Sequence, residues 1–224
     1  MKRSAPRGAK PGERLPRGET RRKLVEAALD LFSTRAYEEV TVGEIAAAAG
    51  VAHGLLFHYF DSKRGLYLAS LDEAARQLNV AHETDVSAAP GARVRELLTK
   101  HLHHLAAHRD LALNLILRGG NDPEASEMFE ADRWKQIRWV CDVLDLDPDN
   151  AAIGTTMRAF GAAADDATLR WLQDGQPHQV AAMVEALVEI LVGSLHAASR
   201  LDPALETRAA IGRLRRPGVS RRTA

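Results

Sequence analysis

Apolar residues recur along most of the chain at the three- and four-residue spacing that places them on one face of a helix. The first such stripe predicts a helix from Thr20, a suitable cap, to about Thr34, and it consists of Leu24, Val25, Ala28, Leu31 and Phe32. Similar stripes predict helices over residues 62–81, 92–107, 110–118, 123–146, 149–173 and 177–198, with a loop over 82–91. The alanine and leucine content favours the same class. The chain is therefore predicted to be all-α.

The stretch TVGEIAAAAGVAHGLLFHYFDSK, which begins at Thr41, carries the densest local signals. Thr41 and Glu44 have capping-box spacing, which predicts a helix that begins at Val42. Gly50 follows where the chain must turn, because a residue without a Cβ adopts left-handed dihedral angles at no steric cost. A second short helix is expected over about residues 52–58. Two short helices joined by a glycine-containing turn are typical of the helix-turn-helix, whose second helix enters the DNA major groove.

This stretch resembles the DNA-binding signature of the TetR family of bacterial repressors. Its first helix matches the family pattern T-x-x-x-I-A-x-x-A-G-V, and its second follows G-x-L-Y-x-Y-F-x-x-K. The resemblance implies a three-helix helix-turn-helix head followed by a larger helical ligand-binding and dimerisation domain. By the same resemblance, the family's DNA contacts carry over to Thr41, Val42, Ala52, His53, Leu55, Phe57, His58, Tyr59 and Lys63.

Two positions depart from the family pattern. The family usually has a small hydroxyl residue where Leu55 stands and a tyrosine where Phe57 stands. Leu55 offers only an apolar contact, for instance to a thymine methyl group, and Phe57 lacks a phenolic donor for a phosphate. The operator sequence therefore does not carry over from the family, whereas the mode of binding does.

The side chains of the second helix divide by chemistry. Leu56 and Phe60 are expected in the core, where they hold the helix in place. His53 and His58 are available for DNA, the alternative being an ordinary solvated surface. Asp61 is a suitable cap for the next helix, and the lysine that opens that helix forms a phosphate site with the free N–H groups of its first turn.

The formal net charge of zero hides an uneven distribution. Residues 1–64 hold 12 Lys and Arg against 8 Asp and Glu, residues 65–207 hold 12 against 22, and residues 208–224 hold 6 against none. A basic surface for nucleic acid is therefore compatible with the neutral total. Residues 1–18 are expected to be a disordered basic arm, which either solubilises the protein or adds DNA contacts.

Three histidines form the main chemical constellation outside the helix-turn-helix. His101, His104 and His108 lie on one side of a predicted helix. Imidazole is a common metal ligand, but no Cys, Asp or Glu completes a site, so no metal is expected. Polar groups of a ligand pocket, pH-responsive groups and ordinary surface or core histidines remain as alternatives.

The later helices carry aromatic stripes that are usually core, although in a sensor domain such side chains line an apolar cavity. The positions expected to line a ligand pocket are His101, Leu105, His108, Leu113, Leu117, Phe129, Trp134, Ile137, Cys141 and Trp171. Cys141 is either a redox-sensing thiol or a small buried hydrophobic residue. The expected ligand is small and apolar or amphipathic.

The expected organisation has four parts: a basic arm over residues 1–18, a DNA-binding head over 19–66, a ligand-binding and dimerisation domain over 67–200, and an Arg-rich tail over 201–224, disordered after Arg208. The last two long helices resemble the family's dimerisation pair, the alternative being that they only close the core of one chain. A homodimer is favoured because one recognition helix contacts too few bases, and two-fold pairing sets half-sites a helical turn apart.

The predicted function is a homodimeric, ligand-responsive transcriptional regulator, of the repressor type, that binds a palindromic operator. A ligand among the helices of residues 92–173 would shift the helix over 62–81, so that the two heads no longer match successive major grooves. The alternative is an architectural or division-linked DNA-binding protein without an effector. No nucleophile elbow, phosphate loop or HExxH motif occurs, so neither an enzyme nor a cofactor is expected.

Cysteine content and hydropathy set the expected compartment. A single cysteine rules out an intramolecular disulfide and fits a reducing cytosol. The N-terminus has no apolar segment of the signal-peptide type, and no run of ~18 apolar residues occurs, so neither export nor a membrane span is expected. The predicted location is cytoplasmic.

Overall fold

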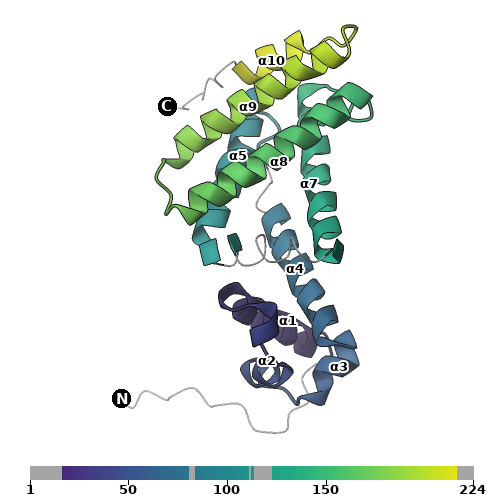
Figure 1. Cartoon of the computed structure of the whole chain (residues 1–224), viewed down its shortest axis with the longest axis vertical. Coiled ribbons are helices and arrows are strands. Elements are labelled where there is room, and N and C mark those ends of the chain that lie inside the picture. Colours follow the sequence, from purple (N-terminus) through teal and green to yellow (C-terminus); the bar gives the residue numbers. More distant parts are fainter. Residues whose placement is uncertain (1–16, 81–83, 111, 114–122, 216–224) are drawn as a thin grey trace, which may run out of the picture. The chain divides into compact units, whose positions relative to one another are not determined.

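A computed structural model describes residues 17–80, 84–110, 112–113 and 123–215 (Figure 1). Within these residues the backbone forms nine α-helices and one 3₁₀ helix and contains no β-strand, which confirms the predicted all-α class. The contacts divide the chain into two compact units, Met1–Ser70 and Leu71–Ala224, here called the head and the larger unit. Almost all of the predicted basic arm lies outside the described residues.

The head contains α1 (Arg17–Thr34), the 3₁₀ helix η1 (Tyr37–Glu39), α2 (Val42–Ala49), α3 (Gly54–Phe60) and the first turns of α4 (Lys63–Val80). Its buried residues include Leu24, Ala28, Phe32, Val40, Ile45, Leu56, Leu66 and Tyr67. Such burial stabilises helices that are too short to persist alone. The predicted start of the first helix is wrong: α1 begins at Arg17, and Thr20 is buried within it.

The junction between α3 and α4 also differs from the prediction. Asp61 has a positive φ of 59° and ends α3, so it does not cap α4. The cap is Ser62, whose Oγ accepts a hydrogen bond from the N–H of Gly65 at 3.0 Å. A Cβ at Gly65 would lie 2.2 Å from the carbonyl oxygen of Phe60. The two helices therefore approach each other at a point where only a glycine fits.

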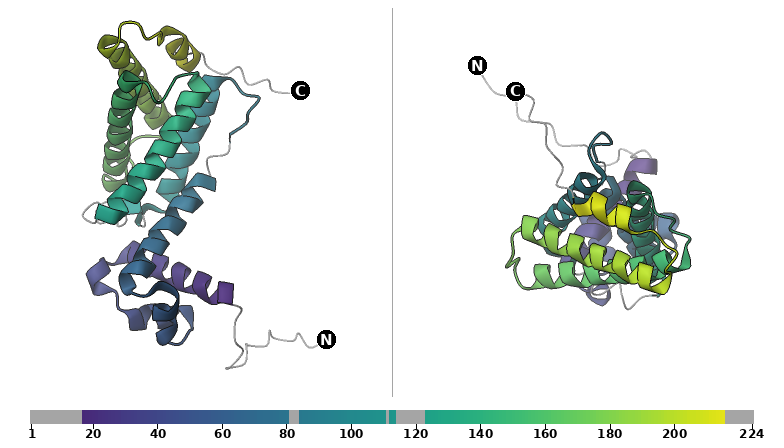
Figure 2. Two further views of the ribbon diagram at one scale, coloured as in Figure 1. Left: turned by 90° about the vertical axis from the view of Figure 1, so that its right-hand side faces the viewer. Right: turned by 90° about the horizontal axis from the view of Figure 1, so that it is seen from above.

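The larger unit combines the end of α4 with α5 (Pro90–Ala107), α7 (Pro123–Leu144), α8 (Ala151–Gln173), α9 (Val180–Leu201) and α10 (Arg208–Arg215). α8 and α9 run side by side (Figures 1 and 2). One buried cluster includes Leu144, Ile153, Met157 and Leu191, and a second includes Leu102, Trp171, Leu172 and Leu187. The stripes seen in the sequence meet in these two clusters.

Several helix ends in the larger unit differ from the predicted ones. Pro90 opens α5 instead of ending a loop, because the first helical position needs no N–H donor and suits the fixed φ of proline. α8 begins at Ala151, two residues after its predicted start, because Asn150 caps it: the Oδ1 of Asn150 accepts from the N–H groups of the two residues that follow Ala151. The short helix predicted from Asp110 lies largely outside the described residues.

The predicted disorder after Arg208 is wrong for residues 208–215, which form α10. The buried residues of this helix are Ala210, Ile211 and Leu214. Arg95 of α5 donates a hydrogen bond to the carbonyl of Leu214 at 2.6 Å, and Arg213 donates to the carbonyl of Leu144. In the sequence, this short apolar stripe lies among arginines and does not stand out. Contacts with the other helices of the larger unit place it in the core.

Among the described helices, α9 is long and apolar enough to cross a membrane by length and composition. Its packing accounts for that composition. Eight of its residues are buried in the larger unit: Met183, Val184, Leu187, Val188, Leu191, Val192, Leu195 and Ala198. The helix is therefore part of the core of this unit.

Candidate DNA-binding surface and ligand cavity

The turn between α2 and α3 has the geometry that the sequence predicts. The hydroxyl of Thr41 accepts from the N–H of Glu44 at 3.2 Å, and the N–H of Thr41 donates to Oε2 of Glu44 at 2.8 Å, which is a complete capping box. Gly50 ends α2 in the left-handed region, with φ 66° and ψ 35°. α3 begins at Gly54, about two residues later than predicted.

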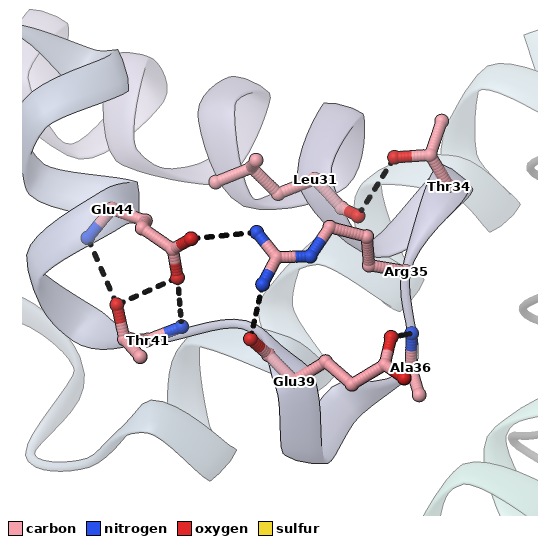
Figure 3. Close-up of polar contacts among 7 residues, drawn as sticks. All are labelled: Leu31, Thr34, Arg35, Ala36, Glu39, Thr41 and Glu44. Carbon is pink, nitrogen blue, oxygen red and sulfur yellow. Dashed lines mark hydrogen bonds and ion pairs between the residues drawn. The ribbon is translucent and has the colours of Figure 1, made fainter.

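Arg35 extends this capping box into a larger network (Figure 3). Its Nη1 lies 2.7 Å from Oε1 of Glu44, and its Nη2 donates to the carbonyl of Glu39. Hydrogen bonds from the Thr41 hydroxyl and from Arg35 lower the pKa of Glu44 to about 2. One guanidinium thus ties the end of α1 to η1 and to the first turn of α2, and no motif in the sequence pointed to it.

α3 and the turn that precedes it carry six of the nine residues expected to contact DNA. Leu56 and Phe60 are buried, as predicted, and hold the helix on the head. Ala52, His53 and His58 are exposed, Leu55 and Tyr59 are half-buried, and 45% of the surface of Phe57 is exposed. The His53 ring lies 5.8 Å from that of Phe57, so the two residues form one aromatic surface.

Two helix starts flank this surface. At α2, the Thr41 hydroxyl donates its hydrogen to Oε2 of Glu44 at 2.7 Å, so it is already committed within the head. At α4, Nζ of Lys63 lies 4.1 Å from the ring centroid of Tyr37, where a cation–π contact orients it. The Tyr37 ring packs in turn on Phe32 and Tyr67. Core aromatic residues therefore position a lysine that was expected to contact phosphate.

The larger unit contains a partly open cavity of about 330 Å³ whose walls come from α4, α5, α7 and α8. Its lining residues are Ala75, His101, Leu105, Ser126, Phe129, Glu130, Asp132, Arg133, Gln136, Asp165, Thr168, Leu169 and Leu172. A second cavity of about 60 Å³ has mainly apolar walls, including Leu97, Ile137, Val140, Phe160 and Leu187. The polar residues that line both are His101, Arg133, Gln136, Asp165 and Thr168. Apolar walls with a few convergent polar groups are the usual character of a ligand pocket.

Four of the expected pocket residues line these cavities: His101, Leu105 and Phe129 the larger one, and His101 and Ile137 the smaller one. Five others lie elsewhere: His108, Leu113, Trp134, Cys141 and Trp171. Leu117 lies outside the described residues. Helical spacing identified the correct helices, but it could not identify Arg133 and Asp165, because these charged residues resemble ordinary surface positions.

The expected pocket residues that lie outside the two cavities make other contacts within the larger unit. Trp134 stacks with Arg158, whose guanidinium carbon lies 4.2 Å from a ring centroid, and the Trp171 indole donates to the carbonyl of His178 at 2.8 Å. Cys141 is fully buried in the core, and burial raises the pKa of its thiol to about 11, which favours the small hydrophobic role over a redox sensor. His108 ends α5 beside His104.

Of the three histidines, His101 lines the cavities, and His104 and His108 lie next to each other. The rings of His104 and His108 are 4.7 Å apart, and burial together with the charge of His108 lowers the pKa of His104. No group of three or more His, Cys, Asp or Glu in the described part of the chain is placed to hold a metal ion.

Comparison with known proteins supports the assignment of a helix-turn-helix in the head. Residues 24–70 match the tetR family of bacterial regulatory proteins. The transcriptional activator FasR of Mycolicibacterium smegmatis is 28% identical over 194 residues, which cover 84% of this chain and 88% of that protein.

Two solved structures extend the likeness to the larger unit. A tetR-family transcriptional regulator from Streptomyces coelicolor superposes with a TM-score of 0.74 at 26% identity, with 88% of each chain covered. FadR of Bacillus subtilis, solved in complex with stearoyl-CoA, shares the fold with a TM-score of 0.60 at 17% identity, covering 77% of this chain and 98% of that one. Together with the helix-turn-helix geometry of the head, these likenesses show that the chain belongs to the TetR family of bacterial regulatory proteins, which bind DNA and regulate transcription.

Proposed function

We propose that the protein is a homodimeric repressor that binds a palindromic operator and leaves it when a small amphipathic ligand enters the larger unit. The observation that supports DNA binding is the exposed face of α3. Phe57 and His58 lie exposed on a short helix that Leu56 and Phe60 hold in place. Such a face suits the major groove, where apolar groups contact thymine methyls and imidazoles reach base edges or phosphates.

The contacts around α3 complete the proposed interface. His53, Leu55 and Ala52 would face bases, and Tyr59 would reach a phosphate through its hydroxyl. The Thr41 hydroxyl is bonded to Glu44, so the phosphate contact at Thr41 and Val42 would use the N–H groups of the first turn of α2. Lys63 would add a cation at the start of α4.

The outer face of α8 and α9 supports the homodimer. Among its exposed residues, which also include polar ones such as Glu189 and His196, is a series of small or apolar side chains: Ala159, Ala162, Ala163, Ala182, Ala186, Gly193 and Ala197, with Ile190 at 36% exposure. Small side chains let two helix pairs approach closely, and a two-fold axis would place the same pair of a second copy against this face as a four-helix bundle.

The position of α4 supports the response to a ligand. Ala75 of this helix lines the larger cavity, and Lys63 lies at the start of the same helix. A ligand that binds one arrangement of α4 better than another would therefore change DNA affinity, by no more than the difference between its two affinities. The FadR structure with stearoyl-CoA is consistent with ligand binding in proteins of this fold.

The proposal is tested by titrating the protein onto labelled DNA from upstream of its own gene, at two salt concentrations. His58→Ala should weaken specific binding about tenfold, and Lys63→Ala should lower the salt dependence by about one phosphate contact. His103→Ala, which changes an exposed histidine of α5, is the matched control and should bind like the wild type. Unchanged affinity in both head variants, or loss of the dimer in light scattering, would refute these roles.

The alternative function is an architectural DNA-binding protein without an effector. It predicts equal affinity for the upstream DNA and for unrelated competitor DNA, and no small molecule that releases either. Because FasR is named an activator, the direction of regulation needs a separate measurement. A reporter fused to the upstream DNA should become more active when the gene is deleted if the protein is a repressor.

A further inference from the structure

An ion pair lies in the wall that the two cavities share. Nε and Nη2 of Arg133 on α7 approach the same oxygen of Asp165 on α8, Oδ2, at 2.6 and 2.5 Å. Gly161 lies one helical turn before Asp165, and a Cβ there would be 2.7 Å from Cδ of Arg133. The arginine stem therefore lies directly on the α8 backbone, and its charged end faces the cavities.

The other charged residues of the larger cavity have partners outside it. Glu130 pairs with Arg158 at 2.9 Å, and Asp132 pairs with Lys135 at 2.7 Å, and both of these cations are more than half exposed. Counted together with these two partners, the charged residues of the wall balance. A charged ligand can bind strongly only by exchanging with one member of an existing pair.

In the Arg133–Asp165 pair, a ligand anion can replace the carboxylate more readily than a ligand cation can replace the guanidinium. A ligand cation that displaced Arg133 would leave a guanidinium unpaired beside an apolar cavity, and a guanidinium does not lose its proton in proteins. A ligand anion that displaced Asp165 would keep Arg133 paired, and the released carboxyl group can become neutral by taking up one proton. The chemistry of the pair therefore favours an anion.

We infer that the cavity binds an amphipathic monoanion, a carboxylate with a hydrocarbon chain, whose head group replaces Asp165 on Arg133. The inference rests on the proposed function, because it names the ligand class of the proposed effector site. The mainly apolar cavity beyond the pair would receive part of the chain. A volume of about 330 Å³ lies at the small end of ligand pockets, which suits a chain of about ten carbons better than a whole acyl-CoA.

Proton uptake follows from this exchange. Burial raises the pKa of Asp165 even with Arg133 bound, and removal of Arg133 takes away the main group that opposes that rise. The charged and titratable groups around the two cavities are Arg133, Glu130 and Asp132 of α7 and His101 of α5, while α4 presents Ala75. Binding of the carboxylate should therefore be accompanied by proton uptake and should strengthen as the pH falls.

The test is calorimetric titration of the full chain with decanoate, decylamine and decanol, in two buffers of different ionisation enthalpy. Decanoate should bind at least about tenfold more tightly than decylamine, with proton uptake. Arg133→Gln should weaken decanoate binding by about tenfold or more and leave decanol within about twofold. Asp165→Asn should strengthen decanoate binding and abolish proton uptake. Arg170→Gln, which removes an exposed cation of α8 that pairs with Asp166 outside the cavity walls, is the matched control.

The outcomes separate the ligand class from the regulatory role. Tighter binding of decylamine, or equal losses for decanoate and decanol in Arg133→Gln, would overturn the inference, as would weaker decanoate binding in Asp165→Asn. The complex with operator DNA is then titrated with decanoate. Binding of decanoate without release of DNA would support the ligand class and refute the proposed effector response, because the two measurements are independent.

Discussion

The head and the larger unit use the same kinds of side chain over very different sequence separations. In the head, Arg35 and Glu44 are nine residues apart, and the capping box spans three. In the larger unit, Arg133 reaches Asp165 over 32 residues, and Arg95 reaches Glu185 over 90. The head is therefore built from local signals, while the larger unit depends on which helices meet.

The same difference separates the proposed DNA-recognition surface from the proposed ligand cavity. A surface that must match the regular DNA groove needs a fixed helix pair, which short-range caps and turns provide. A cavity that must accept a particular ligand needs only a suitable set of walls, which different sequences can supply.

The largest effect is expected at the α3–α4 junction of the head. In Gly65→Ala, the new Cβ would meet the backbone oxygen of Phe60 at 2.2 Å, and no side-chain rotation can relieve the clash. We expect a loss of about 3 kcal/mol in the free energy of unfolding of the head. All three tyrosines lie in the head and all three tryptophans in the larger unit, so urea unfolding can be followed separately in each. Gly18→Ala, with nothing within 4 Å, is the control and should change little.

A smaller effect on the free energy of unfolding is expected from substitutions at the two glycines of α8. Gly161→Ala would place a Cβ 2.7 Å from Cδ of Arg133 and 3.0 Å from Cδ1 of Ile137, side chains that can partly move. We expect a loss of about 1–2 kcal/mol, measured by tryptophan fluorescence in urea. Gly154→Ala on the same helix meets its nearest atom at 3.6 Å and should gain up to about 1 kcal/mol from helix propensity. Equal effects of the two changes would contradict the close contact between α7 and α8.

The smallest effect is expected from the carboxylate of Glu44, and it depends on pH. Its folded-state pKa of about 2 lies below the ordinary value of 4.5, so its ionised form stabilises the head fully above about pH 4.5. That contribution disappears as the pH falls toward 2. Glu44→Gln should therefore lower the melting temperature of the head at neutral pH, and the difference from the wild type should shrink in acid. A difference that stays constant down to pH 2 would show that the pairing with Thr41 and Arg35 is unimportant.

The sequence contains enough information to predict the helix-turn-helix in detail. The cap at Thr41, the left-handed Gly50 and the buried Leu56 and Phe60 each depend on neighbours a few residues away. Contacts between such near neighbours cost little loop-closure entropy. They require particular residue types at a fixed spacing, and a sequence pattern shows that spacing directly. The exposure of Phe57 follows from the same helical period.

The long-range features required the tertiary structure. Helix α10 looks like an arginine-rich tail until its apolar residues meet α5 and α9, and Arg133 and Asp165 look like surface charges until α7 and α8 come together. Five expected pocket residues were placed elsewhere for the same reason. A stripe shows which face of a helix is buried but not which helix covers it, because side-chain periodicity carries no information about the partner. The sequence by itself thus determined most of the helices and the DNA-binding motif, and only the packing of distant helices decided α10, the cavity and its charged pair.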